Sequence, residues 1–88
     1  MKGKRRPEKS TFTREYRIAL QLLKEARIRS RITQVELAKQ VGQTQSYISK
    51  VERGEARLDI FQLRRFLLAI GVSLRHFVEQ FESKLSGR

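Results

Sequence analysis

Apolar residues recur along this chain at the three- and four-residue intervals that place side chains on one face of an α-helix. The pattern covers residues 13–30, 60–70 and 74 to about 82, and two shorter segments lie between residues 34 and 52. We therefore expect an all-α domain of five helices. The predicted inward-facing residues of the three longer segments are Tyr16, Ala19, Leu20, Leu23, Ala26, Ile60, Leu63, Phe66, Leu67, Ile70, Leu74 and Phe77.

Residues that start and stop helices bound the two central segments. Thr33, followed three positions later by Glu36, forms a capping box in which each side chain bonds the other residue's backbone amide. Gly42 supplies the left-handed backbone that ends a helix without strain, Thr44 caps the next helix, and Gly54 stops it. The sequence thus predicts two short helices joined by a tight turn.

Similar signals bound the outer helices and the domain. Asp59 and Ser73 are predicted N-caps, and Gly71 lies where the fourth helix should stop. The domain is expected to span residues 11–82, after a flexible basic arm, residues 1–10, and before a frayed tail, residues 83–88. With five basic residues and one acid, the arm either follows DNA phosphates or is simply solvated.

The charge balance narrows the class of partner. The chain holds 20 lysines and arginines against nine acids, a formal net charge of +11. Such an excess favours a polyanion, nucleic acid before an anionic membrane. With no cysteine, one histidine and one aspartate, the sequence offers little from which to build a metal site or a catalytic triad. We therefore expect no enzyme activity, no cofactor and no metal.

Membrane insertion is not expected either. No segment approaches the roughly 20 apolar residues that span a bilayer, and no apolar signal-peptide core follows the basic N-terminus. The basic residues are scattered over several segments and do not form one face opposite an apolar one. These features predict a cytoplasmic protein.

The second central helix carries the side chains with the clearest binding chemistry. Ile48 and Val51 predict its buried face. The opposite face holds hydrogen-bonding side chains and no carboxylate, namely Gln45, Ser46, Ser49 and Lys50. Such a face suits base edges and phosphates, although an ordinary solvated face has the same composition.

The spacing in the central segment resembles the helix-turn-helix of the Cro/C1-type phage repressors and their bacterial relatives. The residues that carry the resemblance are Leu37, Ala38, Val41, Gly42, Ile48 and Val51, and the likeness covers roughly residues 20–77. Gln43 departs from the pattern, since an apolar residue is often found at its position. The resemblance implies a five-helix, lambda-repressor-like fold with the helix-turn-helix at its second and third helices. It also implies that a recognition helix, about Thr44–Arg53, enters the DNA major groove.

The same resemblance implies roles for individual side chains. Gln34 matches a residue that bonds a phosphate and steadies the first side chain of the recognition helix. Arg27 and Glu52 match a structural ion pair that joins the first helix to the third. The residues matching base contacts are Thr44, Gln45, Ser46 and Lys50, and those matching backbone contacts are Tyr47, Ser49 and Arg53. Arg57, in the loop that follows, is placed to reach a phosphate. Alternatively, Tyr47 only packs its ring on the turn, and Lys50 and Arg53 are surface charge.

A dimer is expected because one helix reads only a few base pairs, and two half-sites about 34 Å apart multiply the specificity. Val78, Phe81 and Leu85 form the predicted dimer strip. The interpretation is a bacterial or phage-encoded homodimeric repressor on a palindromic operator. Two alternatives stay open: an antitoxin that also binds a toxin protein and regulates its own operon, and an RNA- or ribosome-associated coactivator.

Overall fold

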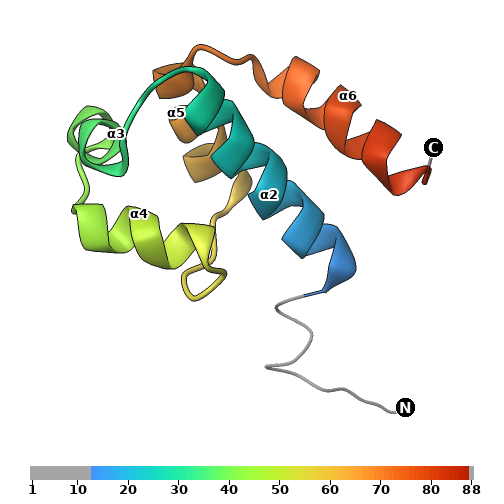
Figure 1. Ribbon diagram of the computed structural model, residues 1–88, viewed down its shortest axis with the longest axis horizontal. Helices are drawn as coiled ribbons and strands as arrows, with labels where there is room; N and C mark the ends of the chain where they lie inside the picture. The colour runs from blue at the N-terminus through green and yellow to red at the C-terminus, as the bar shows by residue number, and fades with distance from the viewer. Residues whose placement is uncertain (1–12, 88) are drawn as a thin grey trace.

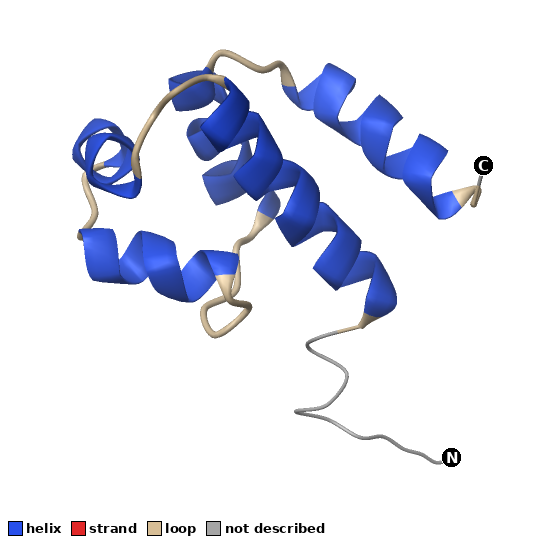
Figure 2. Cartoon of the chain, in the orientation of Figure 1, coloured by secondary structure: helices blue, strands red, loops and turns tan. Residues whose placement is uncertain are grey.

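The computed structural model describes residues 13–87, which form five α-helices and, within that range, no strand. The helices are α2 (Arg14–Arg29), α3 (Gln34–Val41), α4 (Gln45–Glu52), α5 (Ile60–Ile70) and α6 (Leu74–Leu85). Figure 1 shows α2 running through the middle, with α3 and α4 on one side of it and α6 on the other. Short loops join all five helices (Figure 2). The predicted all-α, five-helix architecture is confirmed; the proposed arm, residues 1–10, lies outside the described residues.

Local side chains explain where the helices begin. The hydroxyl of Thr33 accepts from the amide of Glu36 at 3.0 Å, and the Glu36 carboxylate accepts from the amide of Thr33 at 2.8 Å, which completes the predicted capping box. Asp59 forms a second capping box with Gln62 at the start of α5. Thr44 and Ser73 cap α4 and α6 as predicted.

Gly42 and Gly71 end α3 and α5 for a conformational reason. Their φ angles are 72° and 90°, in the left-handed region that other residues seldom adopt. A Cβ atom at either position would meet nothing within 4 Å. The backbone angle, and not a lack of space, therefore favours glycine at both helix ends.

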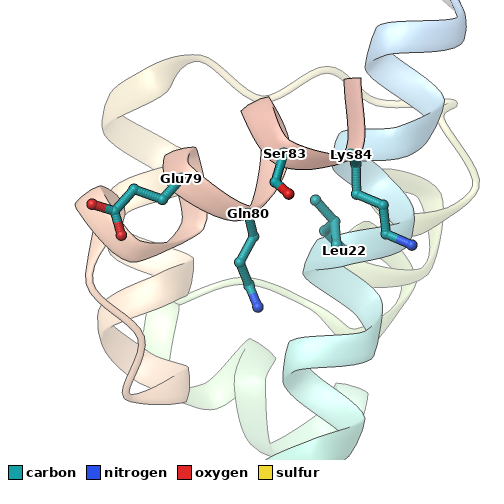
Figure 3. Close-up of a pocket in the computed structure, with 5 residues that line it drawn as sticks. All are labelled: Leu22, Glu79, Gln80, Ser83 and Lys84. Carbon is teal, nitrogen blue, oxygen red and sulfur yellow. The ribbon is translucent and has the colours of Figure 1, made fainter. Parts of the chain in front are cut away.

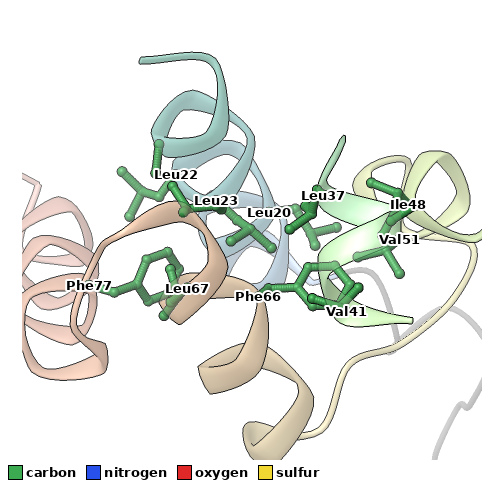
Figure 4. Packing of buried hydrophobic residues seen from close by; sticks show 13 residues of the cluster. Leu20, Leu22, Leu23, Leu37, Val41, Ile48, Val51, Phe66, Leu67 and Phe77 are labelled. Atoms are coloured by element: carbon green, nitrogen blue, oxygen red, sulfur yellow. The ribbon is translucent and has the colours of Figure 1, made fainter. Parts of the chain in front are cut away.

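One apolar core joins all five helices, as Figure 4 shows. Leu37, Ile48, Val51 and Leu67 are the largest side chains that solvent does not reach. Helix α2 contacts α4, α5 and α6, whereas α6 contacts only α2 and α5 among the helices described. The core therefore fixes α4 against α2 and α3, and the remaining surface of α4 lies on the outside of the domain.

Three details differ from the sequence prediction. Helix α6 continues to Leu85, beyond the predicted end at Glu82, and no glycine interrupts it before Gly87. Ile60, predicted to face inward, is 57% exposed because it is the first residue of α5 and lies at the edge of the core. Phe81 packs against the core and Leu85 is half-buried, so Val78, at 42% exposure, is the one clearly exposed residue of the predicted dimer strip.

Candidate nucleic-acid interface

Helices α3 and α4 form a corner around a tight turn, residues 42–44. The amide of Gln43 donates to the carbonyl of Ala38 at 2.8 Å, which closes the end of α3. Ala38 is 3% exposed, and its small side chain allows the two helices to approach closely. The turn and the packed alanine together set the direction in which α4 leaves α3.

Helix α4 has one buried and one open face. Ile48 and Val51 are completely buried, and they anchor the helix in the core. The predicted base-contacting residues Thr44, Gln45, Ser46 and Lys50 are all exposed. The burial of two apolar side chains thus turns the hydrogen-bonding face of the same helix toward solvent.

A buried ion pair joins α2 to the end of α4. The Arg27 guanidinium donates from Nε to Oε2 of Glu52 at 2.6 Å and from Nη2 to Oε1 at 3.1 Å. Its Nη1 donates to the carbonyl of Ile32 at 2.9 Å, so this arginine also holds the loop before α3. The two charged side chains are only 10% and 5% exposed. The ion pair predicted between α2 and α4 is therefore present, in bidentate form.

The ion pair continues into a chain of hydrogen bonds that reaches the open face. Gln34 Nε2 donates to Oε1 of Glu52 at 2.9 Å, and Gln34 Oε1 accepts from Nε2 of Gln45 at 2.7 Å. Gln34 is half-buried and Gln45 exposed, so the chain runs from the core to the surface. The first side chain of α4 is thereby oriented by a residue of α3.

Tyr47 and Arg57 make contacts within the protein. The Tyr47 ring is half-buried and meets the ring of Phe66 edge-on, with centroids 6.5 Å apart, while its hydroxyl accepts from Gln62 at 3.4 Å. The Arg57 guanidinium lies 4.6 Å from the centre of the Tyr16 ring. The Tyr16 hydroxyl also accepts from the amide of Leu58 at 3.3 Å. The contacts of Tyr16 fix the loop between α4 and α5 on α2, and those of Tyr47 join α4 to α5.

Sequence reasoning missed one residue of this surface, Glu55. Arg53 donates from Nε and Nη2 to the two carboxylate oxygens of Glu55 at 2.9 and 3.0 Å, and its Nη1 donates to the hydroxyl of Ser49. Hydrogen bonding and attraction between the partners raise the pKa of Arg53 and lower the pKa of Glu55. The sequence signal that could have revealed this pair is an acid two residues after Arg53, just beyond Gly54.

The described residues also form a depression away from α4. An open depression of about 360 Å³ between α2 and α6 is lined by Leu22, Glu79, Gln80, Ser83 and Lys84 (Figure 3). Among residues 13–87 no three histidine or acidic side chains gather as metal ligands would. Within the same range, no helix is long and apolar enough to cross a bilayer. The exposed face of α4 remains the candidate interface.

Comparison with known proteins decides the family. The sequence profile of helix-turn-helix proteins matches residues 23–77, which include the C-terminal part of α2, the α3–α4 corner, α5 and the start of α6. The chain belongs to the helix-turn-helix family. The resemblance to Cro/C1-type proteins drawn from the sequence is thus confirmed. Membership places the protein in the class of DNA-binding transcription regulators.

Solved structures of other family members are similar over most of the chain. An XRE-family-like protein from Pseudomonas syringae pv. tomato str. DC3000 is 38% identical, with a TM-score of 0.76 over 80% of this chain and 85% of its own. The wild-type restriction-modification controller protein C.Esp1396I is 23% identical, with a TM-score of 0.78 over 88% of this chain and 100% of its own, which shows the shared fold. Comparison with curated protein sequences gave no match.

Proposed function

We propose that this helix-turn-helix protein is a repressor that binds a specific double-stranded DNA sequence by inserting α4, about Thr44–Arg53, into the major groove. The observation that carries the proposal is the open face of α4. Its hydrogen-bonding side chains are exposed because Ile48 and Val51 are completely buried on the opposite side. An operator held in this way would be closed to RNA polymerase where it overlaps a promoter.

The residues on this face suit different bases. A glutamine such as Gln45 can bond N6 and N7 of adenine together, and a lysine such as Lys50 can donate to O6 and N7 of guanine. Thr44 and Ser46 can bond either base or contact a thymine methyl group. We assign sequence discrimination to these four side chains, with Gln45 held in place by Gln34.

Phosphate contacts supply the affinity in this proposal. Gln34, Tyr47, Ser49 and Arg53 flank the base-reading side chains, and Arg57 lies in the loop that follows α4. The net charge of +11 favours association with any nucleic acid, and binding of this kind weakens steeply as salt rises. Affinity and specificity therefore depend on separate sets of side chains.

A solved relative supports DNA binding by an oligomer. C.Esp1396I forms a tetramer in complex with its natural 35 base-pair operator; in that structure it is 25% identical to this chain, with a TM-score of 0.74 over 82% of this chain and 95% of its own. We propose that this protein binds a palindromic operator as a homodimer. Two copies related by a two-fold axis would present two recognition helices to successive major grooves.

We propose a dimer surface at the start of α5, and the strip predicted on α6 remains the alternative. Ile60 and Phe61 are 57% and 76% exposed. Beside them is a mostly apolar groove of about 330 Å³, lined by Tyr16, Ala19, Leu20, Leu23, Arg57, Leu58, Asp59, Ile60 and Leu63. A second copy fits this face because it holds an apolar projection and an apolar groove, which a two-fold axis can pair with one another.

Phe61→Glu is expected to weaken self-association at least about tenfold, because an apolar side chain that the proposed dimer would bury becomes a charge. Analytical ultracentrifugation over a concentration series measures the effect. Val78→Glu, on the predicted α6 strip, is the matched control and should leave the dimer intact. If Val78→Glu dissociates the dimer and Phe61→Glu does not, the interface is on α6 as the sequence suggested.

Selecting bound duplexes from a random DNA pool tests the function itself. The wild-type protein should enrich a palindrome with half-sites about one helical turn apart. Enrichment of a non-palindromic site would contradict the symmetric dimer, and no enrichment would contradict specific recognition. Stronger binding to RNA than to DNA in the same assay would favour the coactivator alternative.

Arg57→Ala is expected to weaken binding to the selected duplex and to a random duplex by the same factor. The slope of log affinity against log salt should become shallower by about 1, the loss of one phosphate contact. Fluorescence anisotropy at four salt concentrations measures both quantities. Arg75→Ala, an exposed arginine on α6, is the control and should change neither. A loss confined to the selected duplex would show that Arg57 reads sequence.

A further inference from the structure

The Arg53–Glu55 pair lies on the surface that the proposed function assigns to DNA. Arg53 follows the last residue of α4 and Glu55 lies two positions later. The guanidinium is engaged by both carboxylate oxygens, at 2.9 and 3.0 Å, and by the Ser49 hydroxyl. Two side chains that the proposed function assigns to phosphate, Ser49 and Arg53, are thus already bonded within the protein.

The position of Glu55 is fixed by the backbone. Its amide donates to the carbonyl of Lys50 at 2.8 Å, so the turn after α4 returns this residue toward the helix end. The Lys50 ammonium also contributes to lowering the pKa of Glu55, as a cation nearby must. The Glu55 carboxylate is therefore bonded to one cation of the recognition surface, Arg53, and attracted by a second, Lys50.

Solvent and ligands can reach this pair. The side chains of Arg53 and Glu55 are 54% and 55% exposed, in contrast to the buried Arg27–Glu52 pair. A carboxylate and a phosphate bind a guanidinium with the same planar, two-pronged geometry. Glu55 therefore occupies on Arg53 the site that a DNA phosphate would otherwise take.

We propose that Glu55 limits the affinity of this surface for DNA by competing with DNA phosphate for Arg53. Binding to random-sequence DNA comes almost entirely from phosphate contacts. Its affinity is therefore lowered when Glu55 keeps Arg53 from binding a phosphate. Binding to the operator adds base contacts from α4, but a phosphate that binds Arg53 there must displace the same carboxylate. Glu55 thus lowers the affinity for random DNA and for the operator alike. This inference rests on the proposed function.

Glu55→Gln tests the proposal because it removes the charge and keeps the size of the side chain. We expect it to bind a random-sequence duplex about three- to fivefold more tightly than the wild type, the effect of one exposed ion pair. Affinity for the selected duplex should rise by a similar factor, so the ratio of the two affinities stays nearly constant, as expected for a phosphate contact and not for a base contact. Anisotropy titrations of the wild type and the variant on both duplexes measure this ratio.

Two further variants separate this competition from a general effect of charge. Glu79→Gln makes the same change on α6, a helix without contact to α4, and should leave both affinities as in the wild type. In an Arg53→Gln background, Glu55→Gln should lose most of its effect, because the side chain it competes for is gone. Circular dichroism confirms that each variant is folded.

The outcomes are distinct. If the wild type binds DNA specifically but Glu55→Gln binds the random duplex no better, or less well, the competition is disproved and Glu55 instead positions Arg53. An equal gain with Arg53→Gln present also overturns the proposal. A wild type that binds no duplex at all would overturn the proposed function, and the role of Glu55 with it.

Discussion

Replacing Glu52 with methionine is expected to lower the free energy of unfolding by about 3 to 5 kcal/mol. The change leaves the Arg27 guanidinium buried without its carboxylate, with only the Ile32 carbonyl as a hydrogen-bond partner in the present arrangement. Gln34 also loses the acceptor of its Nε2 group. Chemical denaturation followed by circular dichroism measures the loss, which is a large fraction of the stability of a small domain.

A double variant separates the cost of an unpaired charge from the value of the pair. Arg27→Met with Glu52→Met removes both charges, and we expect it to recover more than half of the loss, because two apolar side chains can pack in the space. Glu79→Met, at an exposed position on α6, should change the free energy of unfolding by less than about 0.5 kcal/mol. A Glu52→Met protein as stable as the wild type would show that water or movement of Arg27 compensates for the charge.

Local chemistry explains why much of this fold could be predicted. Thr33, Thr44, Asp59 and Ser73 bond backbone groups three residues away, so the sequence alone identifies these helix starts. Gly42 ends α3 through its own φ angle. The inward faces follow from the 3.6-residue period of a helix. The Arg27–Glu52 pair joins residues 25 positions apart, and it came from the family resemblance.

The features that the sequence did not predict share a physical cause, because each depends on how the helices pack. Periodicity places Phe81 on the apolar face of α6 but does not say that it packs, partly buried, against the core, nor that Phe61 on α5 stays exposed. The contact of Arg57 with the Tyr16 ring joins positions 41 residues apart, 16 and 57, which no local pattern links. Glu55 is close to Arg53 in sequence, yet the turn after α4 decides that the two side chains meet.

Gln45→Ala is expected to weaken binding to the selected duplex by about 1 to 3 kcal/mol, the value of one good base contact. Binding to a random duplex should stay within about a factor of two, because nonspecific binding depends on phosphate contacts, which Gln45 does not supply. Anisotropy titrations on both duplexes measure the change in their ratio. Gln21→Ala, an exposed glutamine on α2, is the matched control. An equal loss on both duplexes would mean that Gln45 contacts the backbone.

Gln34→Ala tests how Gln45 is held. It removes the oxygen that accepts from Gln45 at 2.7 Å and leaves the side chains of α4 unchanged. If that bond orients Gln45 for its base, the losses of specificity from Gln34→Ala and Gln45→Ala should not add in the double variant, because they remove one interaction. Gln34→Ala alone should also weaken random binding, since Gln34 is assigned a phosphate, and this distinguishes it from Gln45→Ala. Fully additive losses of specificity would mean that the two glutamines act on DNA independently.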